Sequence, residues 1–125
     1  MSARTWTGRI VRAVPVLFLV VDAVVKLLRI GPVVDSFNEL GYPQNLALAI
    51  GLIEAVCLLV LFIARTSVIG AVLLTGYLGG AVATHLRIGN PLASHILFPA
   101  YIGMLIWAGM ALIDSRIVTL VAGRE

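Results

Sequence analysis

Long apolar segments separated by short polar turns dominate the pattern of this chain. Residues 46–64 and 66–86 are two such segments, and Glu54 and His85 are the main ionisable side chains inside them. A helix rises 1.5 Å per residue, so about 20 residues cross the roughly 30 Å hydrocarbon layer of a bilayer. The pattern therefore predicts membrane-spanning helices.

Glycine and proline clusters at Gly31-Pro32, Gly41-Tyr42-Pro43 and Gly89-Asn90-Pro91 mark helix ends. Pro99 is expected to kink the last helix. These signals predict one domain over residues 1–125 with four spans, at about residues 7–30, 45–64, 68–88 and 92–113.

Residues 33–40 form a segment too short to span a membrane. Val33, Val34, Phe37 and Leu40 fall on one helical face, and polar residues cover the other. This amphipathic pattern is typical of a helix that lies at the membrane interface. The predicted fold class is an all-α integral membrane four-helix bundle with a short interfacial helix between the first two spans.

Composition supports a lipid environment, since 61% of the 125 residues are hydrophobic and 12% are charged. Soluble domains have about 45–50% apolar and about 25% charged residues. The net charge of +3 comes from basic residues at segment ends, not from one patch, which argues against nucleic acid as a partner. The single cysteine, Cys57, excludes an internal disulfide and a Cys-x-x-Cys redox motif.

The basic residues also predict the orientation of the chain. Three lie at or near the ends that connect spans one to two and three to four: Lys26, Arg29 and Arg87. Six lie near the two termini and the connection between spans two and three: Arg4, Arg9, Arg12, Arg65, Arg116 and Arg124. Because cytoplasmic loops are enriched in Lys and Arg, both termini are expected in the cytoplasm, and the protein in the inner (plasma) membrane as a multi-pass protein.

A set of polar residues is expected in the outer half of the bundle. Asp22, Lys26 and Glu54 lie about 6–13 Å inside the spans by the helical rise. Each costs about 2.5–3.5 kcal/mol in the membrane if unpaired, so the three are expected to form one interacting group. The full candidate ligand-binding or polar cluster is Asp22, Lys26, Glu54, Tyr77, Thr84, His85, Arg87 and His95.

Two interpretations of this cluster stay open: a structural ion-pair network, and a hydrated pocket for a small molecule or a proton. Because one Lys26 could not neutralise two ionised carboxylates, either one carboxyl stays protonated through desolvation, or His85 or Arg87 supplies a second positive partner. His85 and His95 flank one short loop without other ligand spacing, so we predict no metal site and do not favour haem. Tyr77 and Tyr101 are expected to be packing or interfacial residues and not redox tyrosines.

Small residues recur every fourth position in the third span, at Ala71, Thr75, Gly79 and Ala83. Such a stripe lets helices approach closely in lipid. We expect it to pack inside the bundle, and homodimerisation through this face is the alternative.

The segments Gly76–Arg87, Gly89-Asn90-Pro91 and Ser94–Pro99 resemble those of the DoxX-like family of small four-helix membrane proteins. The Gly41-Tyr42-Pro43 turn and the Asp22-x-x-x-Lys26 spacing are similar as well. The resemblance implies a bacterial inner-membrane protein. Some relatives are linked to thiosulfate:quinone oxidoreduction and others to receptor assembly, and no catalytic residue is implied.

The expected function is binding of a quinone-like or other small apolar molecule, or service as an accessory subunit of a membrane redox system. An assembly or scaffold factor for a larger membrane protein is the alternative. A proton-coupled membrane enzyme comes third, because no nucleophile or cofactor motif is present. The expected partners are the lipid bilayer, a small apolar ligand such as a quinone or lipid, and a membrane-protein partner or a second copy of the chain.

Overall fold

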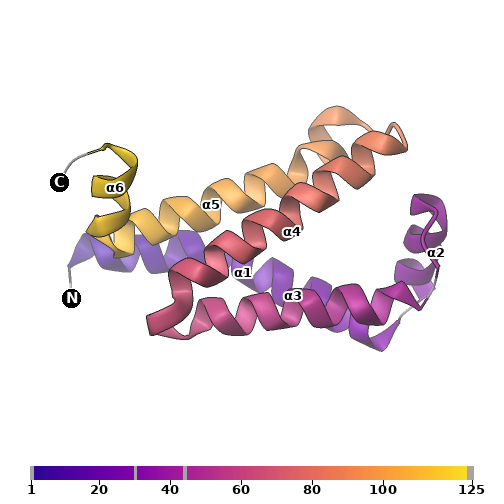
Figure 1. The fold of residues 1–125 in the computed structure, drawn as a ribbon, viewed down its shortest axis with the longest axis horizontal. Coiled ribbons are helices and arrows are strands. Elements are labelled where there is room, and N and C mark those ends of the chain that lie inside the picture. Colours follow the sequence, from indigo (N-terminus) through magenta and orange to yellow (C-terminus); the bar gives the residue numbers. More distant parts are fainter. Residues whose placement is uncertain (1, 30, 44, 124–125) are drawn as a thin grey trace.

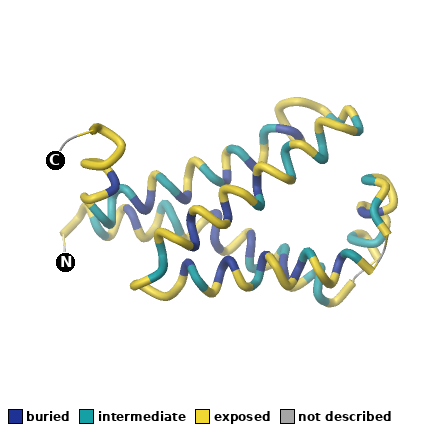
Figure 2. The backbone as a smooth tube through the Cα atoms, viewed as in Figure 1, coloured by how far each residue is buried: buried dark blue, intermediate teal, exposed yellow. Residues whose placement is uncertain are grey.

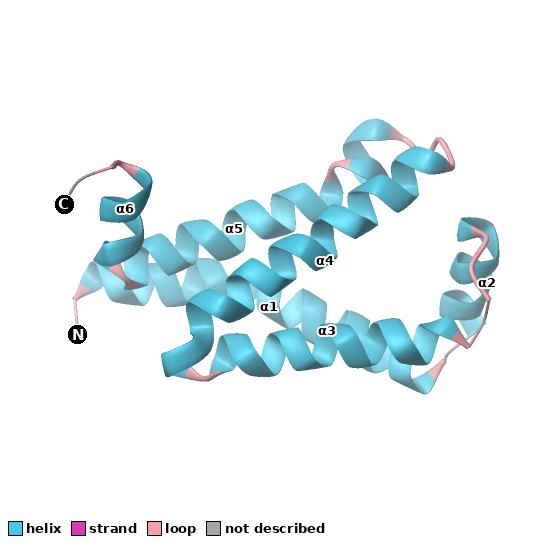
Figure 3. Cartoon of the chain, in the orientation of Figure 1, coloured by secondary structure: helices cyan, strands magenta, loops and turns pink. Residues whose placement is uncertain are grey.

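The computed structural model describes residues 2–29, 31–43 and 45–123, and within these ranges it contains helices and no strands. Figures 1 and 3 show their order along the chain. The elements are α1 (Ala3–Leu28), α2 (Gly31–Leu40), α3 (Leu46–Phe62), a 3₁₀ turn (Ala64–Thr66), α4 (Ser67–Arg87), a π-helical turn (Leu92–Ile96), α5 (Phe98–Ile113) and α6 (Ser115–Val121).

The four long helices contact one another in a closed order. Helix α1 packs against α3 and α5, and α4 packs against the same two helices. Both termini, α6 and the α3–α4 connection lie at one end of the molecule, here called the terminal end (Figure 1). Helix α2 and the α4–α5 connection lie at the other end, the α2 end, where the α4–α5 pair diverges from α1 and α3 (Figure 1).

Two helical stretches of the described chain are long and apolar enough to cross a membrane: Ala64–Arg87 and Leu92–Ile113. Helix α3 is apolar but shorter. Only 22% and 33% of the most apolar windows of the two longer stretches are buried inside the protein, so most of their side chains face outward (Figure 2). Large apolar residues such as Leu17, Leu59 and Met104 are more than half exposed.

Helices α1 and α5 approach each other closely because glycines meet at their contact. A Cβ atom on Gly109 would lie 2.6 Å from the Cβ atom of Arg12, and one on Gly8 would lie 2.8 Å from the carbonyl oxygen of Gly109. Real Cβ atoms are not found at such distances. The core then continues between the four helices through Leu19, Leu74 and Ile106, among others.

The helix boundaries differ from the predicted ones in several places. Helix α1 begins at Ala3, where the Ser2 side chain accepts a hydrogen bond from the Thr5 backbone N–H and so caps the helix. Gly31 begins α2 and Pro32 lies in its first turn, so the Gly31-Pro32 pair, predicted as the end of the first span, also starts the next helix. The predicted α2 face is present, with Phe37 buried and Val33, Val34 and Leu40 half-buried.

The last predicted span is two elements instead of one kinked helix. Its first five residues form the π-helical turn, and α5 begins at Phe98. Pro99 therefore occupies the first turn of α5, where its missing N–H has no partner to lose. Helix α6 is not predicted by the apolar pattern, and its signal is Asp114, whose side chain accepts the Arg116 backbone N–H. Hydrogen bonds from Arg116 hold the pKa of Asp114 below its usual range.

The small-residue stripe of α4 packs internally over only part of its length. Ala71 is buried in the core, and the Thr75 hydroxyl accepts a hydrogen bond from the Trp107 indole at 2.7 Å. Gly79 and Ala83 are exposed, and a Cβ atom on Gly79 would have open space around it. The expectation that the whole stripe packs within the chain is therefore wrong for its C-terminal half.

Candidate functional site

Lys26 is the centre of the polar cluster. Its Nζ atom donates hydrogen bonds to Asp22 Oδ2 at 2.6 Å, Glu54 Oε2 at 3.1 Å and the Tyr77 hydroxyl at 2.6 Å. The Tyr77 hydroxyl in turn donates to Glu54 Oε2 at 2.7 Å. These bonds use all three N–H groups of the ammonium. The structure thus brings Asp22, Lys26 and Glu54 together as predicted, and Tyr77 of the candidate cluster joins them.

Three helices position these side chains. Asp22 and Lys26 are one turn apart on α1 and share a face. Glu54 comes from α3 and Tyr77 from α4. Gly51 precedes Glu54 by one turn, and a Cβ atom there would lie 3.1 Å from the Cβ atom of Lys26. The absence of a side chain at Gly51 therefore brings α1 close enough for Lys26 to reach Glu54.

Exposure within the cluster rises from Glu54 to Asp22. The Glu54 side chain is fully buried, that of Lys26 is 15% exposed and that of Asp22 is 31% exposed. Glu54 Oε1 is buried and has no hydrogen-bond partner among the described residues. The cluster holds two carboxyl groups against one ammonium group, and its accessible side is the one that carries Asp22.

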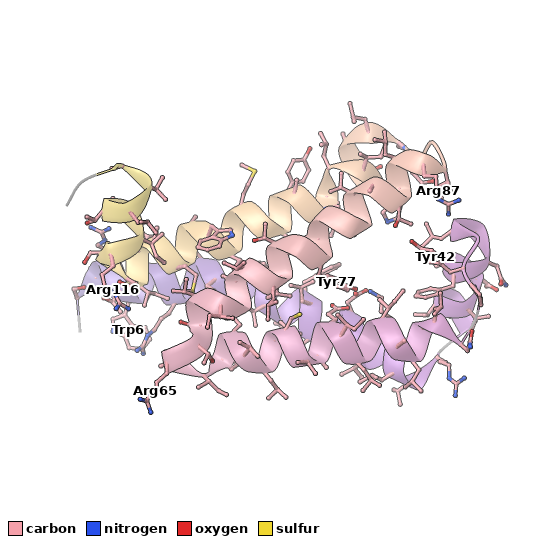
Figure 4. The ribbon with its side chains drawn as sticks, viewed as in Figure 1. Trp6, Tyr42, Arg65, Tyr77, Arg87 and Arg116 are labelled. Atoms are coloured by element: carbon pink, nitrogen blue, oxygen red, sulfur yellow. The ribbon has the colours of Figure 1, made fainter. Side chains whose placement is uncertain are left out.

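A pocket of about 350 Å³ opens beside the accessible side of the cluster. This volume lies in the usual range of small-molecule sites, about 300–1,000 Å³. Figure 4 shows Tyr77 deep in the molecule and Tyr42 near the α2 end. The lining residues are Asp22, Lys26, Ser36, Phe37, Leu40, Tyr42, Ile50, Ile53, Tyr77, Gly80, Ala81, Thr84 and His85. The pocket thus presents Asp22, Lys26 and Tyr77 of the cluster, further polar side chains at Ser36, Tyr42, Thr84 and His85, and apolar residues between them.

Two contacts tie the α2 region to α4 beside this pocket. The hydroxyl of Tyr42, just after α2, lies 2.8 Å from Thr84 Oγ1. Thr84 donates to the Gly80 carbonyl, so its oxygen accepts the proton of Tyr42. Arg87 donates to the carbonyl oxygen of Leu40, the last residue of α2. Helix α2 therefore forms one wall of the pocket, and these two hydrogen bonds hold the α2 region against α4.

Not every predicted site residue belongs to the cluster or the pocket. His85 lines the pocket, and its Nδ1 lies 2.6 Å from the Asn90 amide nitrogen. His95 is exposed, and its ring centroid lies 6.0 Å from that of His85 without reaching the pocket. Arg87 contacts α2 and forms no ion pair with a described carboxylate, so the alternative in which it supplies the second positive partner is wrong.

Tyr77, which belongs to the predicted cluster, has its hydroxyl in the polar network and also packs against the hydrophobic core, whereas Tyr101 lies at the surface. Ser36, Phe37 and Tyr42 are pocket residues that the sequence does not single out. The feature of the sequence that could have indicated their place beside the pocket is the Gly41-Tyr42-Pro43 turn. Across the described ranges, no group of three or more His, Cys, Asp or Glu side chains could hold a metal ion.

The fold and the site define a small all-helical protein with a buried ion cluster beside a pocket. The profile of the DoxX-like family matches residues 10–109, four fifths of the 125-residue chain, and the chain belongs to this membrane-associated family. Searches of curated proteins and of solved structures gave no match.

Proposed function

We propose that α1, α3, α4 and α5 cross the membrane as a four-helix bundle, and that the pocket binds a small, mainly apolar molecule with one polar group. In this role the chain is a ligand-binding or accessory subunit of a membrane system. One observation carries the proposal: Asp22, Lys26 and Tyr77 line the same pocket as several apolar side chains, while the buried Glu54 carboxylate accepts hydrogen bonds from Lys26 and Tyr77.

The distribution of polar and apolar side chains supports the membrane arrangement. The intramembrane charges turn toward one another, and the outward faces carry exposed leucines, valines and phenylalanines. Helix α1 has 26 residues and is about 39 Å long by the helical rise, enough to cross the bilayer with a tilt. The excess of basic residues near the termini supports an orientation with the terminal end in the cytoplasm and the pocket toward the outer side of the inner membrane.

This orientation predicts that Asn90→Cys, in the α4–α5 connection, reacts with a membrane-impermeant thiol reagent in intact cells. The native Cys57 is buried and gives little background. Arg65→Cys, in the exposed α3–α4 connection, is the matched control and should react only after the membrane is permeabilised. The opposite pattern would put the pocket on the cytoplasmic side.

The free hydrogen-bonding capacity of the cluster indicates the kind of polar group it would take. Lys26 uses its three N–H groups within the protein, whereas Asp22 uses Oδ2 and has no hydrogen bond at Oδ1 among the described residues. A ligand donor such as a hydroxyl group fits this oxygen. The apolar body would then lie against Phe37, Ile50 and Ile53. A quinol-like or phenol-like molecule meets these requirements.

Two neighbouring glycines of α4 provide a matched test of the proposal. Gly79 and Gly80 both have open space at the position of a Cβ atom, but only Gly80 lines the pocket. Gly80→Trp should fill the pocket and lower the amount of small molecule that co-purifies with the protein about tenfold or more. Gly79→Trp should leave it in place. Mass spectrometry of organic extracts from both variants measures this, and equal ligand content in the two would contradict the proposal.

A second candidate function, assembly of a larger membrane protein, is favoured by the exposed small face of α4. Gly76, Gly79 and Ala83 are exposed, and a Cβ atom on either glycine would meet nothing within 4 Å. Small residues on a lipid-facing helix favour contact with another helix. The same pair of variants separates the candidates, because a scaffold would lose its crosslinked partner in Gly79→Trp and keep it in Gly80→Trp.

A further inference from the structure

A second cavity lies at the terminal end of the molecule, between α1 and the C-terminal end of α3. Its volume is about 320 Å³. Arg9 and Arg12 line it together with apolar side chains that include Val16, Leu17, Val20 and Phe62. Among the described residues, no carboxylate lines this cavity. We call it the arginine groove.

The two arginines have little to bind within the described chain. Arg12 is half-buried, and its one hydrogen bond to a described residue is to the thioether sulfur of Met110, at 3.2 Å. A thioether is a weak acceptor, and a guanidinium carries five N–H donors. Arg9 lies over the Trp6 ring at 5.8 Å, and neither arginine forms an ion pair with a described carboxylate. The guanidinium N–H groups at the polar end of the groove therefore have no strong hydrogen-bond acceptor within the described chain.

The dimensions of the groove match one leaflet of a bilayer. Arg9 and Val20 are separated by eleven residues of α1, or about 16 Å at the helical rise. Half of the roughly 30 Å hydrocarbon layer is about 15 Å. Trp6, next to Arg9, is a residue type that concentrates at the membrane–water interface. The arginines thus lie at headgroup level when Val20 lies near the midplane.

We propose that the arginine groove binds an anionic phospholipid of the leaflet at the terminal end. The phosphate accepts hydrogen bonds from Arg9 and Arg12, because a guanidinium suits the geometry of phosphate oxygens. One acyl chain lies along Val16, Leu17 and Phe62. This site rests on the membrane arrangement proposed above, but not on the ligand pocket at the α2 end.

The test uses the full chain in nanodiscs of phosphatidylglycerol and phosphatidylcholine in equal amounts, followed by native mass spectrometry of the lipids retained after release into detergent. The wild-type protein should retain phosphatidylglycerol over phosphatidylcholine. Arg9→Gln with Arg12→Gln should lower this retention about tenfold or more, a difference of about 1.4 kcal/mol. The control, Arg4→Gln with Arg65→Gln, removes two charges from the same end outside the groove and should retain the lipid.

Three results would overturn the proposal. Equal retention of the two lipids by the wild-type protein would show that the net negative charge of the headgroup is not selected. Equal loss in the two double variants would assign the effect to net charge. Displacement of the lipid by millimolar glycerol phosphate would identify a site for a soluble anion. For every variant, incorporation into nanodiscs and the amount of small molecule in the α2-end pocket are also measured. A protein that does not enter nanodiscs would contradict the membrane proposal and is thereby distinguished from one that enters but does not retain the lipid.

Discussion

Lys26→Met is expected to lower the free energy of unfolding by about 3–5 kcal/mol, because it removes one partner of a buried ion pair. Glu54 would keep the Tyr77 hydroxyl as its only donor, while its side chain remains fully buried. Asp22 would also lose its partner, although its partial exposure allows some contact with polar surroundings. Reversible unfolding in mixed detergent micelles measures the change.

Arg87→Met is the matched control for this substitution, since it also replaces a basic residue near the α2 end. Arg87 is exposed and its bond is to a backbone carbonyl, so its loss should cost about 1 kcal/mol. A cost for Lys26→Met as small as that of the control would mean that the Lys26–Glu54 bond contributes little to the fold.

The meeting of Asp22, Lys26 and Glu54 was predictable because depth and cost constrain it. A helix has a fixed rise, so the sequence gives the position of each charge along its span, and in the proposed membrane arrangement an unpaired charge in lipid would be costly. The partners of Arg87 were not predictable in this way. A long side chain near a helix end can reach several acceptors, and the choice of the Leu40 carbonyl depends on where α2 packs.

Tyr77 shows a second limit of the sequence. Its depth in α4 is close to that of the charges, but a tyrosine in a membrane helix also suits an interface or a packed core. The rotation of α4 about its axis decides between these roles, and spacing along one helix does not specify rotation relative to α1 and α3. The contribution of α2 to the pocket depends in the same way on the angle at which α2 packs. The chain turns before and after α2, at Arg29 and Gly41, where φ is positive.

The second large effect is expected when the whole cluster is replaced: Asp22→Leu, Lys26→Met, Glu54→Met and Tyr77→Phe. No buried charge or hydroxyl is left unpaired in this variant, and apolar replacement of a buried ion pair is often neutral or stabilising by about 1–4 kcal/mol. The bundle should therefore fold with a stability close to that of the wild-type protein. Its pocket would keep Ser36, Tyr42, Thr84 and His85 but lose the Asp22–Lys26 group that the proposed ligand contacts, so the ligand should be lost.

The amount of co-purifying small molecule per mole of this folded fourfold variant tests the central claim most directly. Both proteins are purified from native membranes, shown to be folded by circular dichroism and unfolding, and extracted for mass spectrometry. A ligand-binding cluster predicts a folded variant with at most about one tenth of the wild-type ligand content, which corresponds to about 1.4 kcal/mol or more of lost binding. A folded variant that retains the wild-type amount would contradict the account and assign Asp22, Lys26, Glu54 and Tyr77 to structure alone.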